Sequence, residues 1–275
     1  MKTLPFKQVD VFTDKPFLGN PVAVVIGGDA LDSATMQRIA CWTNLSETTF
    51  LLKSSVADYR LRIFTPRREL PFAGHPTLGS AHAARESGFV SSKSRSLRQE
   101  CGAGILDLSV EDGKLFVKAP EPKITPLAAI PGMDVLSPPV RVDVGPVWGV
   151  GEIADAAALA ALKPDMAALA GYSNRHALSG VTVFARSTDG ETAIHVRSFA
   201  PAHGIPEDPV CGSGNISVAA YLGSRNELNR TGKSYIARQG MQVGRDGRVF
   251  MRVEPDGIRL GGHAVTCVDG TIAAG

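Results

Sequence analysis

The hydrophobic and polar positions of this 275-residue chain follow two periods, and together they predict a mixture of strands and helices. Short alternating or continuously apolar runs are typical of strands, and they cover residues 7–12, 21–27, 48–52, 59–64, 104–110, 114–119, 181–186 and 193–199. Helical spacing appears in residues 33–42 with Ser33 as N-cap, after Pro76 through about Arg85, and in residues 214–222. Asp-Gly pairs predict hairpins, and hairpins outnumber crossover helices. The pattern therefore predicts an α+β protein whose mostly antiparallel sheet wraps around a helix.

The chain also resembles itself at an offset of about half its length. Residues 62–84 align without a gap on residues 197–219, and the alignment matches Arg62 with Arg197, Phe64 with Phe199 and Gly79 with Gly214. Two shorter matches keep the same order at nearly the same offset, residues 9–11 with 142–144 and residues 111–116 with 245–250. Three ordered matches at one offset indicate an internal duplication.

The duplication predicts two pseudo-symmetric domains. The first covers residues 1–120, and a C-terminal tail of about residues 264–275 packs back on it. The second covers residues 140–263. Residues 119–139 are rich in proline and lack periodicity, so we expect them to form a linker.

Composition narrows the class of protein. A hydrophobic fraction of 44% and a charged fraction of 20% are typical of a globular protein with a sizeable core. The net charge is +2 and the basic residues are scattered, so we expect neither nucleic acid nor a membrane as partner. The N-terminus lacks the apolar region of a secretory signal, and no apolar run reaches the ~20 residues of a membrane span. Four separated cysteines without a CxxC fit a reducing compartment, so we expect a cytoplasmic protein.

The two matched segments share a turn that leads into a helix. In each half a strand ends in Phe-x-Pro, a proline-bearing loop follows, and glycine opens the helix. The first turn of a helix has unpaired N–H groups that bind carboxylate or phosphate, and Pro76 suits the first helical position. If the halves pack about a pseudo-twofold axis, both helix N-termini face one cleft. Such a cleft would stabilise a substrate that develops negative charge.

Four blocks give the chain a resemblance to a known family. The blocks are VDVFTDKPFLGNPVAVV, NLSETTFL, LPFAGHPTLGSAHA and GIPEDPVCGSG. A further segment, RQGMQVGR at residues 238–245, is similar to another block of the same family. The chain resembles the phenazine-biosynthesis PhzF-like family, which has the diaminopimelate-epimerase-like fold. The resemblance implies two similar domains, each a sheet rolled around a central helix, with the active site between them. It also implies a homodimer.

Three residues are the candidate catalytic groups. Glu47 stands just before an apolar strand, where burial would raise its pKa towards the range of a general acid/base. The resemblance implies that Glu47 moves a proton between carbons. His75 stands at the entry of the first helix and Asp208 before the second. The resemblance assigns both to the substrate pocket.

A further set of residues is expected to bind the substrate, and it comprises Asn20, Ser46, Gly74, Cys211, Gly212, Ser213 and Gly214. We expect no metal, because His75 and His82 are two helical turns apart and no HExxH or CxxC accompanies them. We expect no cofactor either, since the chain lacks a Walker loop and a GxGxxG.

Cys211 departs from the pattern that the resemblance implies. PhzF-like sequences typically read EDPATGSA where this chain reads EDPVCGSG. The Cys-Gly-Ser-Gly run is similar to that of cofactor-independent racemases and epimerases, which use one thiol from each half. A helix N-terminus would lower the pKa of a thiol. The paired position in the first half falls around Gly74 to Pro76, which supplies no thiol, so we expect Cys211 to form the pocket wall.

Three functions are compatible with these residues. The first is a cofactor-independent isomerase that moves a proton along a small carboxylic acid through Glu47. The second is an epimerase, racemase or dehydratase of amino or imino acids that uses Cys211 as one base. The third is a small-acid-binding protein without catalysis, which the complete set of Glu47, His75 and Asp208 disfavours.

Overall fold

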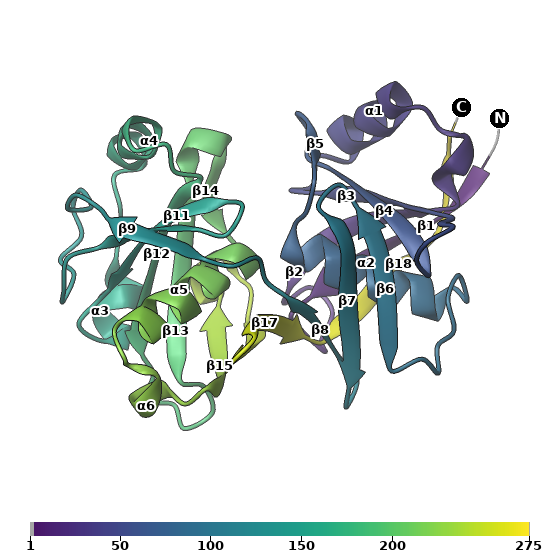
Figure 1. Ribbon diagram of the computed structural model, residues 1–275. Coiled ribbons are helices and arrows are strands. Elements are labelled where there is room, and N and C mark those ends of the chain that lie inside the picture. The colour runs from purple at the N-terminus through teal and green to yellow at the C-terminus, as the bar shows by residue number, and fades with distance from the viewer. Residues whose placement is uncertain (1–2, 275) are drawn as a thin grey trace. The chain divides into compact units, whose positions relative to one another are not determined.

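The computed structural model describes residues 3–274, which divide into two compact units (Figure 1). Unit 1 contains the chain up to Lys118 together with the C-terminal segment from Gly261. Unit 2 is Ala119–Leu260. In Figure 1 unit 1 is coloured purple to blue with the yellow C-terminal strand, and unit 2 is teal to green with yellow-green strands.

Unit 1 is a sheet that wraps around helix α2. Its strands are β1 (Thr3–Val11), β2 (Asn20–Ile26), β3 (Thr48–Leu52), β4 (Tyr59–Phe64), β5 (Glu69–Leu70), β6 (Ser96–Cys101), β7 (Gly104–Glu111), β8 (Lys114–Lys118) and β18 (Ala264–Ala273). Its helices are η1 (Gly28–Ala30), α1 (Ser33–Thr43) and α2 (Gly74–Glu86). Helix α2 packs against β1, β2, β3, β4, β8 and β18 and is buried along most of its length. It is therefore the hydrophobic centre around which this sheet curves.

Unit 2 repeats the plan around helix α5. Its strands are β9 (Lys123–Pro126), β10 (Val140–Asp143), β11 (Val147–Glu152), β12 (Gly180–Arg186), β13 (Ile194–Ala200), β14 (Ile205–Asp208), β15 (Ser234–Gln239), β16 (Gly247–Glu254) and β17 (Gly257–Gly262), whose end from Gly261 belongs to unit 1. Its helices are α3 (Ala156–Ala161), η2 (Pro201–His203), α4 (Met166–Arg175), α5 (Gly212–Ser224), α6 (Leu228–Thr231) and η3 (Met241–Val243). Helix α5 packs on β10, β11, β12 and β16.

The strand pairings of the two units follow one order. In unit 1, β1–β2 is antiparallel, β2–β3 parallel, β3–β4 antiparallel, β4–β6 parallel and β6–β7 antiparallel. In unit 2, the same alternation runs through β10–β11, β11–β12, β12–β13, β13–β15 and β15–β16. The predicted α+β class is thus confirmed, with two similar sheets that each enclose one helix.

The loop that enters the central helix differs in length between the units. The strands that end at Phe64 and Phe199 correspond, but α2 begins at Gly74 and α5 only at Gly212. The gap-free alignment of the sequence therefore holds for the strands and slips by three residues in the helices. Gly79 and Gly214, which it matched, occupy different turns of their helices.

Two local predictions about helix starts are wrong. The N-cap of α1 is Asp32 rather than Ser33, because the Asp32 carboxylate accepts a 2.7 Å hydrogen bond from the Thr35 N–H. Pro76 is the third residue of α2, not the first. Proline is tolerated there for the same reason, since the first four N–H groups of a helix have no intrahelical acceptor.

The predicted linker is also wrong, because residues 119–139 are part of unit 2. Strand β9 pairs antiparallel with β10, from Lys123 opposite Asp143 to Pro126 opposite Val140. Ile130 and Met133 are buried in the core that packs on β12. Proline-rich composition marks irregular backbone here rather than a solvated connection.

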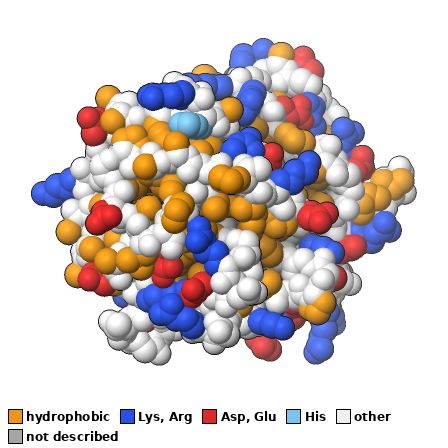
Figure 2. Space-filling model, turned by 60° about the vertical axis from the view of Figure 1, so that its left-hand side comes forward, with side chains coloured by type: hydrophobic (Ala, Val, Ile, Leu, Met, Phe, Trp, Pro, Cys, Tyr) orange, Lys and Arg blue, Asp and Glu red, His pale blue; other side chains and the backbone are white. Residues whose placement is uncertain are grey.

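The surface of unit 2 agrees with the scattered charge of the sequence. Figure 2 brings this unit forward and shows acidic and basic side chains interspersed with hydrophobic ones, without a continuous basic stripe on the face in view. Within residues 3–274, no helix has the length and apolarity that crossing a membrane requires.

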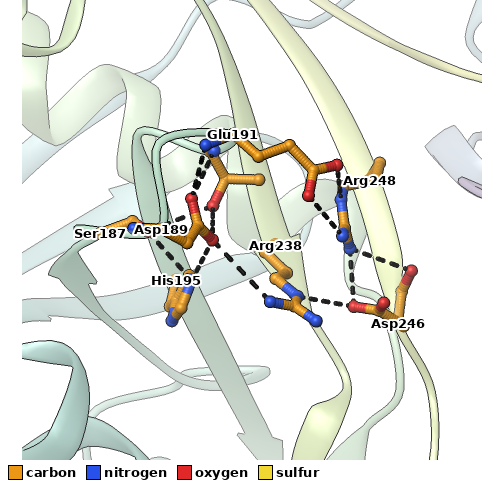
Figure 3. Close-up of polar contacts among 8 residues, drawn as sticks. Ser187, Asp189, Glu191, His195, Arg238, Asp246 and Arg248 are labelled. Carbon is orange, nitrogen blue, oxygen red and sulfur yellow. Dashed lines mark hydrogen bonds and ion pairs between the residues drawn. The ribbon is translucent and has the colours of Figure 1, made fainter.

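A polar network joins two hairpins of unit 2 (Figure 3). In the loop between β12 and β13, Asp189 accepts hydrogen bonds from Thr192 and from His195 Nε2 at 3.0 Å. Arg238 of β15 lies 3.8 Å from Asp189, and its Nε donates to Asp246 at 2.6 Å. Ser187 approaches the same His195 nitrogen as Asp189 does, at 3.1 Å. In a catalytic Ser-His-Asp triad the serine and the aspartate contact opposite nitrogens of the histidine ring. This cluster therefore stabilises the structure and is not a catalytic triad.

We expect Asp189→Asn to lower the free energy of unfolding by about 1 kcal/mol at pH 7, because partly exposed hydrogen bonds to a charged acceptor are lost. Partial burial acts to raise the pKa of Asp189. Hydrogen bonds from His195 and Thr192 outweigh this effect and hold the pKa of Asp189 well below its usual range. A depressed folded pKa stabilises the protein above the unfolded pKa of about 4, and this stabilisation is lost as the pH falls below it. Thermal unfolding at pH 7 and pH 3.5 should therefore show a difference between the two proteins that shrinks at the lower pH. An equal difference at both would contradict the assignment.

Candidate active site

Glu47 directly precedes β3, and the turn that ends α1 fixes its position. Asn44 closes α1 in the left-handed conformation, with φ of 54°. The hydroxyl groups of Thr43 and Thr48 lie 2.6 Å apart across the turn. The Glu47 carbonyl accepts a 3.4 Å hydrogen bond from the Ala23 N–H of β2. These contacts fix the backbone on both sides of the carboxyl group.

The Glu47 carboxyl group is largely removed from water. Its side chain is 15% exposed, and Oε2 has no hydrogen-bond partner among the described residues. Burial raises the pKa of Glu47 to about 7, and a hydrogen bond from the Ser46 side chain opposes the rise. A carboxyl group with this pKa can both take up and release a proton near neutral pH.

His75 meets Glu47 within unit 1. It is the second residue of α2, directly after Gly74, and it is buried. Its Nε2 lies 3.4 Å from Glu47 Oε2. Asn20 is the first residue of β2 and is 1% exposed. The structure thus brings together Glu47 and His75, two residues that the sequence identified from separate motifs.

In unit 2 Asp208 ends β14 and belongs to a tightly fixed turn. Its Oδ1 accepts a 3.1 Å hydrogen bond from the Val210 N–H. Gln239 of β15 donates to the Asp208 carbonyl at 3.0 Å and accepts from the Cys211 N–H at 3.1 Å. The side-chain amide oxygen of Gln239, Oε1, also accepts a 2.9 Å hydrogen bond from the side-chain amide of Asn215 in α5. Gln239 therefore ties the turn both to the sheet and to the helix.

Cys211 is the N-cap of α5 and is buried. Its sulfur accepts a 3.3 Å hydrogen bond from the Gly214 N–H. Burial, followed by the charge of Asp208, raises the pKa of the Cys211 thiol well above its ordinary value. A thiol in this environment is a poor base at neutral pH.

The corresponding cap in unit 1 is Ala73, one residue before the range that the sequence comparison indicated. That position has no thiol, as expected. The raised pKa of the Cys211 thiol disfavours its use as a base, and its place in a pocket wall stays a prediction.

Gly212, Ser213 and Gly214 form the first turn of α5. The sequence predicts that small residues here admit a ligand, and Gly214 has a packing reason as well. A Cβ on Gly214 would lie 2.7 Å from both Ser198 Oγ and Thr182 Oγ1, so the glycine lets the helix approach the sheet. Ser213 Oγ accepts a 2.9 Å hydrogen bond from the indole Nε1 of Trp148.

Sequence reasoning missed three residues of this region: Trp148, Gln239 and Asn215. Gln239 stands in the block at residues 238–245 that carried part of the family resemblance, and this was its only signal in the sequence. Trp148 precedes Ser213 by 65 residues and reaches it only through the folded sheet. Within residues 3–274, no group of three or more His, Cys, Asp or Glu side chains is arranged to hold a metal ion. That both sets of residues serve one substrate stays a prediction.

Comparison with known proteins adds independent information. The family model described as phenazine biosynthesis-like protein, PhzC-PhzF, matches residues 9–270. The chain is 40% identical over 290 residues to antisense-enhancing sequence 1 of Schizosaccharomyces pombe, covering 96% of this chain and 97% of the relative. It is 35% identical over 266 residues to the trans-2,3-dihydro-3-hydroxyanthranilate isomerase of Pseudomonas aeruginosa, covering 92% and 91%. A crystal structure of the Bacillus anthracis phenazine biosynthesis protein of the PhzF family superposes with a TM-score of 0.86 at 27% identity, covering 99% of this chain and 100% of the other.

Proposed function

The chain belongs to the phenazine biosynthesis-like family and is an isomerase, and we propose that it moves a proton between two carbons of a small unsaturated carboxylic acid. Glu47 is the single acid/base of this proposal. The observation that carries it is the buried Glu47 carboxyl group, whose Oε2 accepts no hydrogen bond and lies 3.4 Å from His75 Nε2. A buried acceptor without a partner supports a role in which a substrate atom completes the contact.

The proposed reaction has two proton transfers. The Glu47 carboxylate takes a proton from a carbon next to a carboxylate or double bond, and the electron pair of that C–H bond shifts into the unsaturated system. The protonated Glu47 then returns the proton to another carbon on the same face, so acid and base are regenerated. Closure against water would favour internal return over exchange with solvent.

The other candidate residues bind the substrate in this proposal. His75 orients the reacting part of the acid beside Glu47. Asp208, Gly212 and Ser213 hold polar groups of the substrate and balance the charge that develops during the reaction. The N–H groups of the first turn of α5 suit a carboxylate, because they have no acceptor within the helix.

Corresponding positions in the two units favour a mechanism with one catalytic base over a mechanism with one base from each unit. The pairs Thr48–Phe64 and Val181–Phe199 correspond in the sheets, so Glu47 corresponds to Gly180. Unit 2 therefore has no carboxyl group at the place of Glu47, and unit 1 has Ala73 at the place of Cys211. A mechanism with one thiol from each unit therefore lacks one of its bases.

The name of the Pseudomonas aeruginosa relative suggests the first substrate to test. That protein is a trans-2,3-dihydro-3-hydroxyanthranilate isomerase, so its substrate is a cyclic, unsaturated amino acid. We propose the same chemical class for this chain, as a cytoplasmic homodimer without a cofactor. Fold does not transfer specificity, so the experiment below uses a panel of acids.

We expect a carbon-bound proton of one such acid to exchange when the protein is incubated with it in heavy water. The panel contains trans-2,3-dihydro-3-hydroxyanthranilate together with cyclic unsaturated acids, proline and hydroxyproline. Proton NMR reports which C–H signal disappears or moves. Exchange confined to the α-carbon of proline or hydroxyproline would favour the epimerase function. Binding of a panel acid with neither exchange nor conversion to a product would favour the non-catalytic function and contradict the isomerase proposal.

A further inference from the structure

Trp148 contacts the first turn of α5 from the neighbouring sheet. It lies on β11, where it pairs with Gly180 of the parallel strand β12. The side chain is buried, with the residue 4% exposed. Its indole Nε1–H donates to Ser213 Oγ at 2.9 Å. The indole thus provides a rigid donor to a hydroxyl group that the proposed function places against the substrate.

The indole of Trp148 lies in space that a side chain at position 180 would occupy. A Cβ on Gly180 would lie 2.7 Å from an indole carbon of Trp148 and 2.2 Å from the Phe199 carbonyl oxygen. Both distances are too short for any side chain, so only glycine at position 180 allows the indole to cover the strand. Gly180 therefore leaves the space that the indole of Trp148 occupies beside β12.

The hydrogen bond leaves the Ser213 hydroxyl with one proton to donate. A serine hydroxyl has one O–H donor and two acceptor lone pairs. The indole N–H occupies one lone pair, and it cannot accept a hydrogen bond in return. A second polar neighbour of this hydroxyl is Cys211 Sγ at 3.6 Å, and sulfur is a weak partner. Ser213 is partly exposed, so its O–H can turn to an anion outside the helix.

We propose that Trp148 is a positioning residue, which orients the Ser213 hydroxyl so that its proton is donated to the carboxylate of the substrate. The inference rests on the proposed function, because it takes the substrate to be a carboxylic acid held at the first turn of α5. It adds a residue from β11 to the binding machinery and explains why that residue is tryptophan. Phenylalanine would keep an aromatic ring of smaller volume and would carry no donor.

The test is a double-mutant cycle of Trp148→Phe and Ser213→Ala with the panel acid that exchanges, beginning with trans-2,3-dihydro-3-hydroxyanthranilate. Loss of a hydrogen bond to a charged group predicts a roughly 10- to 100-fold fall in kcat/KM for S213A, carried by KM. W148F should lower kcat/KM about 5-fold in the wild-type background and by less than 1.5-fold in S213A, because the indole acts through the hydroxyl. The matched control is Trp42→Phe, which alters the only other tryptophan, a residue 79% exposed on α1. It should leave kcat/KM unchanged.

A second readout tests the contact without a ligand. In the W42F protein Trp148 is the single tryptophan, so its indole N–H gives one NMR signal. That signal should move upfield when Ser213 becomes alanine. An unmoved signal, or the same fold-loss from W148F in both backgrounds, overturns the inference while the proposed function stands. If no acid of the panel exchanges, the proposed function fails and the inference fails with it.

Discussion

Replacing Glu47 with glutamine is expected to lower turnover by at least about 10³-fold, because an amide of the same shape can neither take nor return a proton. The loss should fall on kcat and kcat/KM alike, since the group acts in the transition state and contributes little to binding. In the wild type, the rate should follow a pH profile with an inflection near 7, the value to which burial raises the pKa of Glu47. Steady-state rates between pH 5 and pH 9 measure both effects.

The same substitution should stabilise the fold at high pH. Because the folded pKa of Glu47 is about 7 against an ordinary value of 4.5, ionisation is more costly in the folded than in the unfolded protein. This cost appears as the pH rises above about 4.5 and is complete above about 7. It amounts to about 3 kcal/mol. E47Q should therefore unfold at a higher temperature than wild type at pH 8, and the two proteins should converge near pH 4.

Cys211→Ala is the matched comparison for E47Q. Cys211 is a buried cap residue whose thiol has a raised pKa, so its loss should leave turnover within about threefold of wild type. A C211A protein that loses turnover while E47Q keeps it would contradict the isomerase proposal. That result would favour a thiol base.

Replacing His75 with glutamine is expected to lower kcat/KM by about 10²-fold. The imidazole Nε2 lies 3.4 Å from the Glu47 carboxyl group, so the ring is placed to orient the reacting atoms beside the base. Misplacement of reacting groups by about 1 Å is sufficient for a loss of this size. Steady-state kinetics with the exchanging acid measure it.

His82→Gln is a control for His75, because both residues belong to α2. His82 contacts the Thr266 hydroxyl of β18 at 3.2 Å and has no role in the proposed site. We expect H82Q to change kcat/KM by less than about threefold. Equal losses from H75Q and H82Q would indicate that the helix responds to any substitution, and would remove His75 from the site.

Local signals in the sequence were sufficient to predict the class of fold. Hairpins depend on turn chemistry such as Asp112-Gly113, and the central helices depend on short periodic segments. Both are properties of neighbouring residues. The strand β9 was missed because Lys123–Pro126 has no alternation of its own, and only its pairing with β10 defines it. Asp32 and Ser33 both suit an N-cap, so the hydrogen bond to Thr35 had to decide between them.

The candidate site was predictable where a motif carries the residue itself. Glu47 and His75 stand in two blocks of the family resemblance, although their 3.4 Å contact is a property of the fold. Contacts to the start of α5 were not predictable. Trp148 reaches Ser213 in its first turn and Gln239 reaches the N-cap Cys211, both from strands distant in sequence. Gly180 illustrates the same limit, because an isolated glycine at the start of a strand does not reveal that an indole must fit over it.

The most direct measurement of the central claim follows a deuterium atom through the reaction. The exchanging acid is labelled with deuterium at the carbon that loses its proton and is converted in ordinary water. If Glu47 carries the proton from one carbon to the other, NMR of the product should show deuterium at the acceptor carbon above the level that solvent supplies. E47Q should form product at least about 10³-fold more slowly than wild type. Product formed by E47Q at the wild-type rate, with the same distribution of deuterium, would contradict the account.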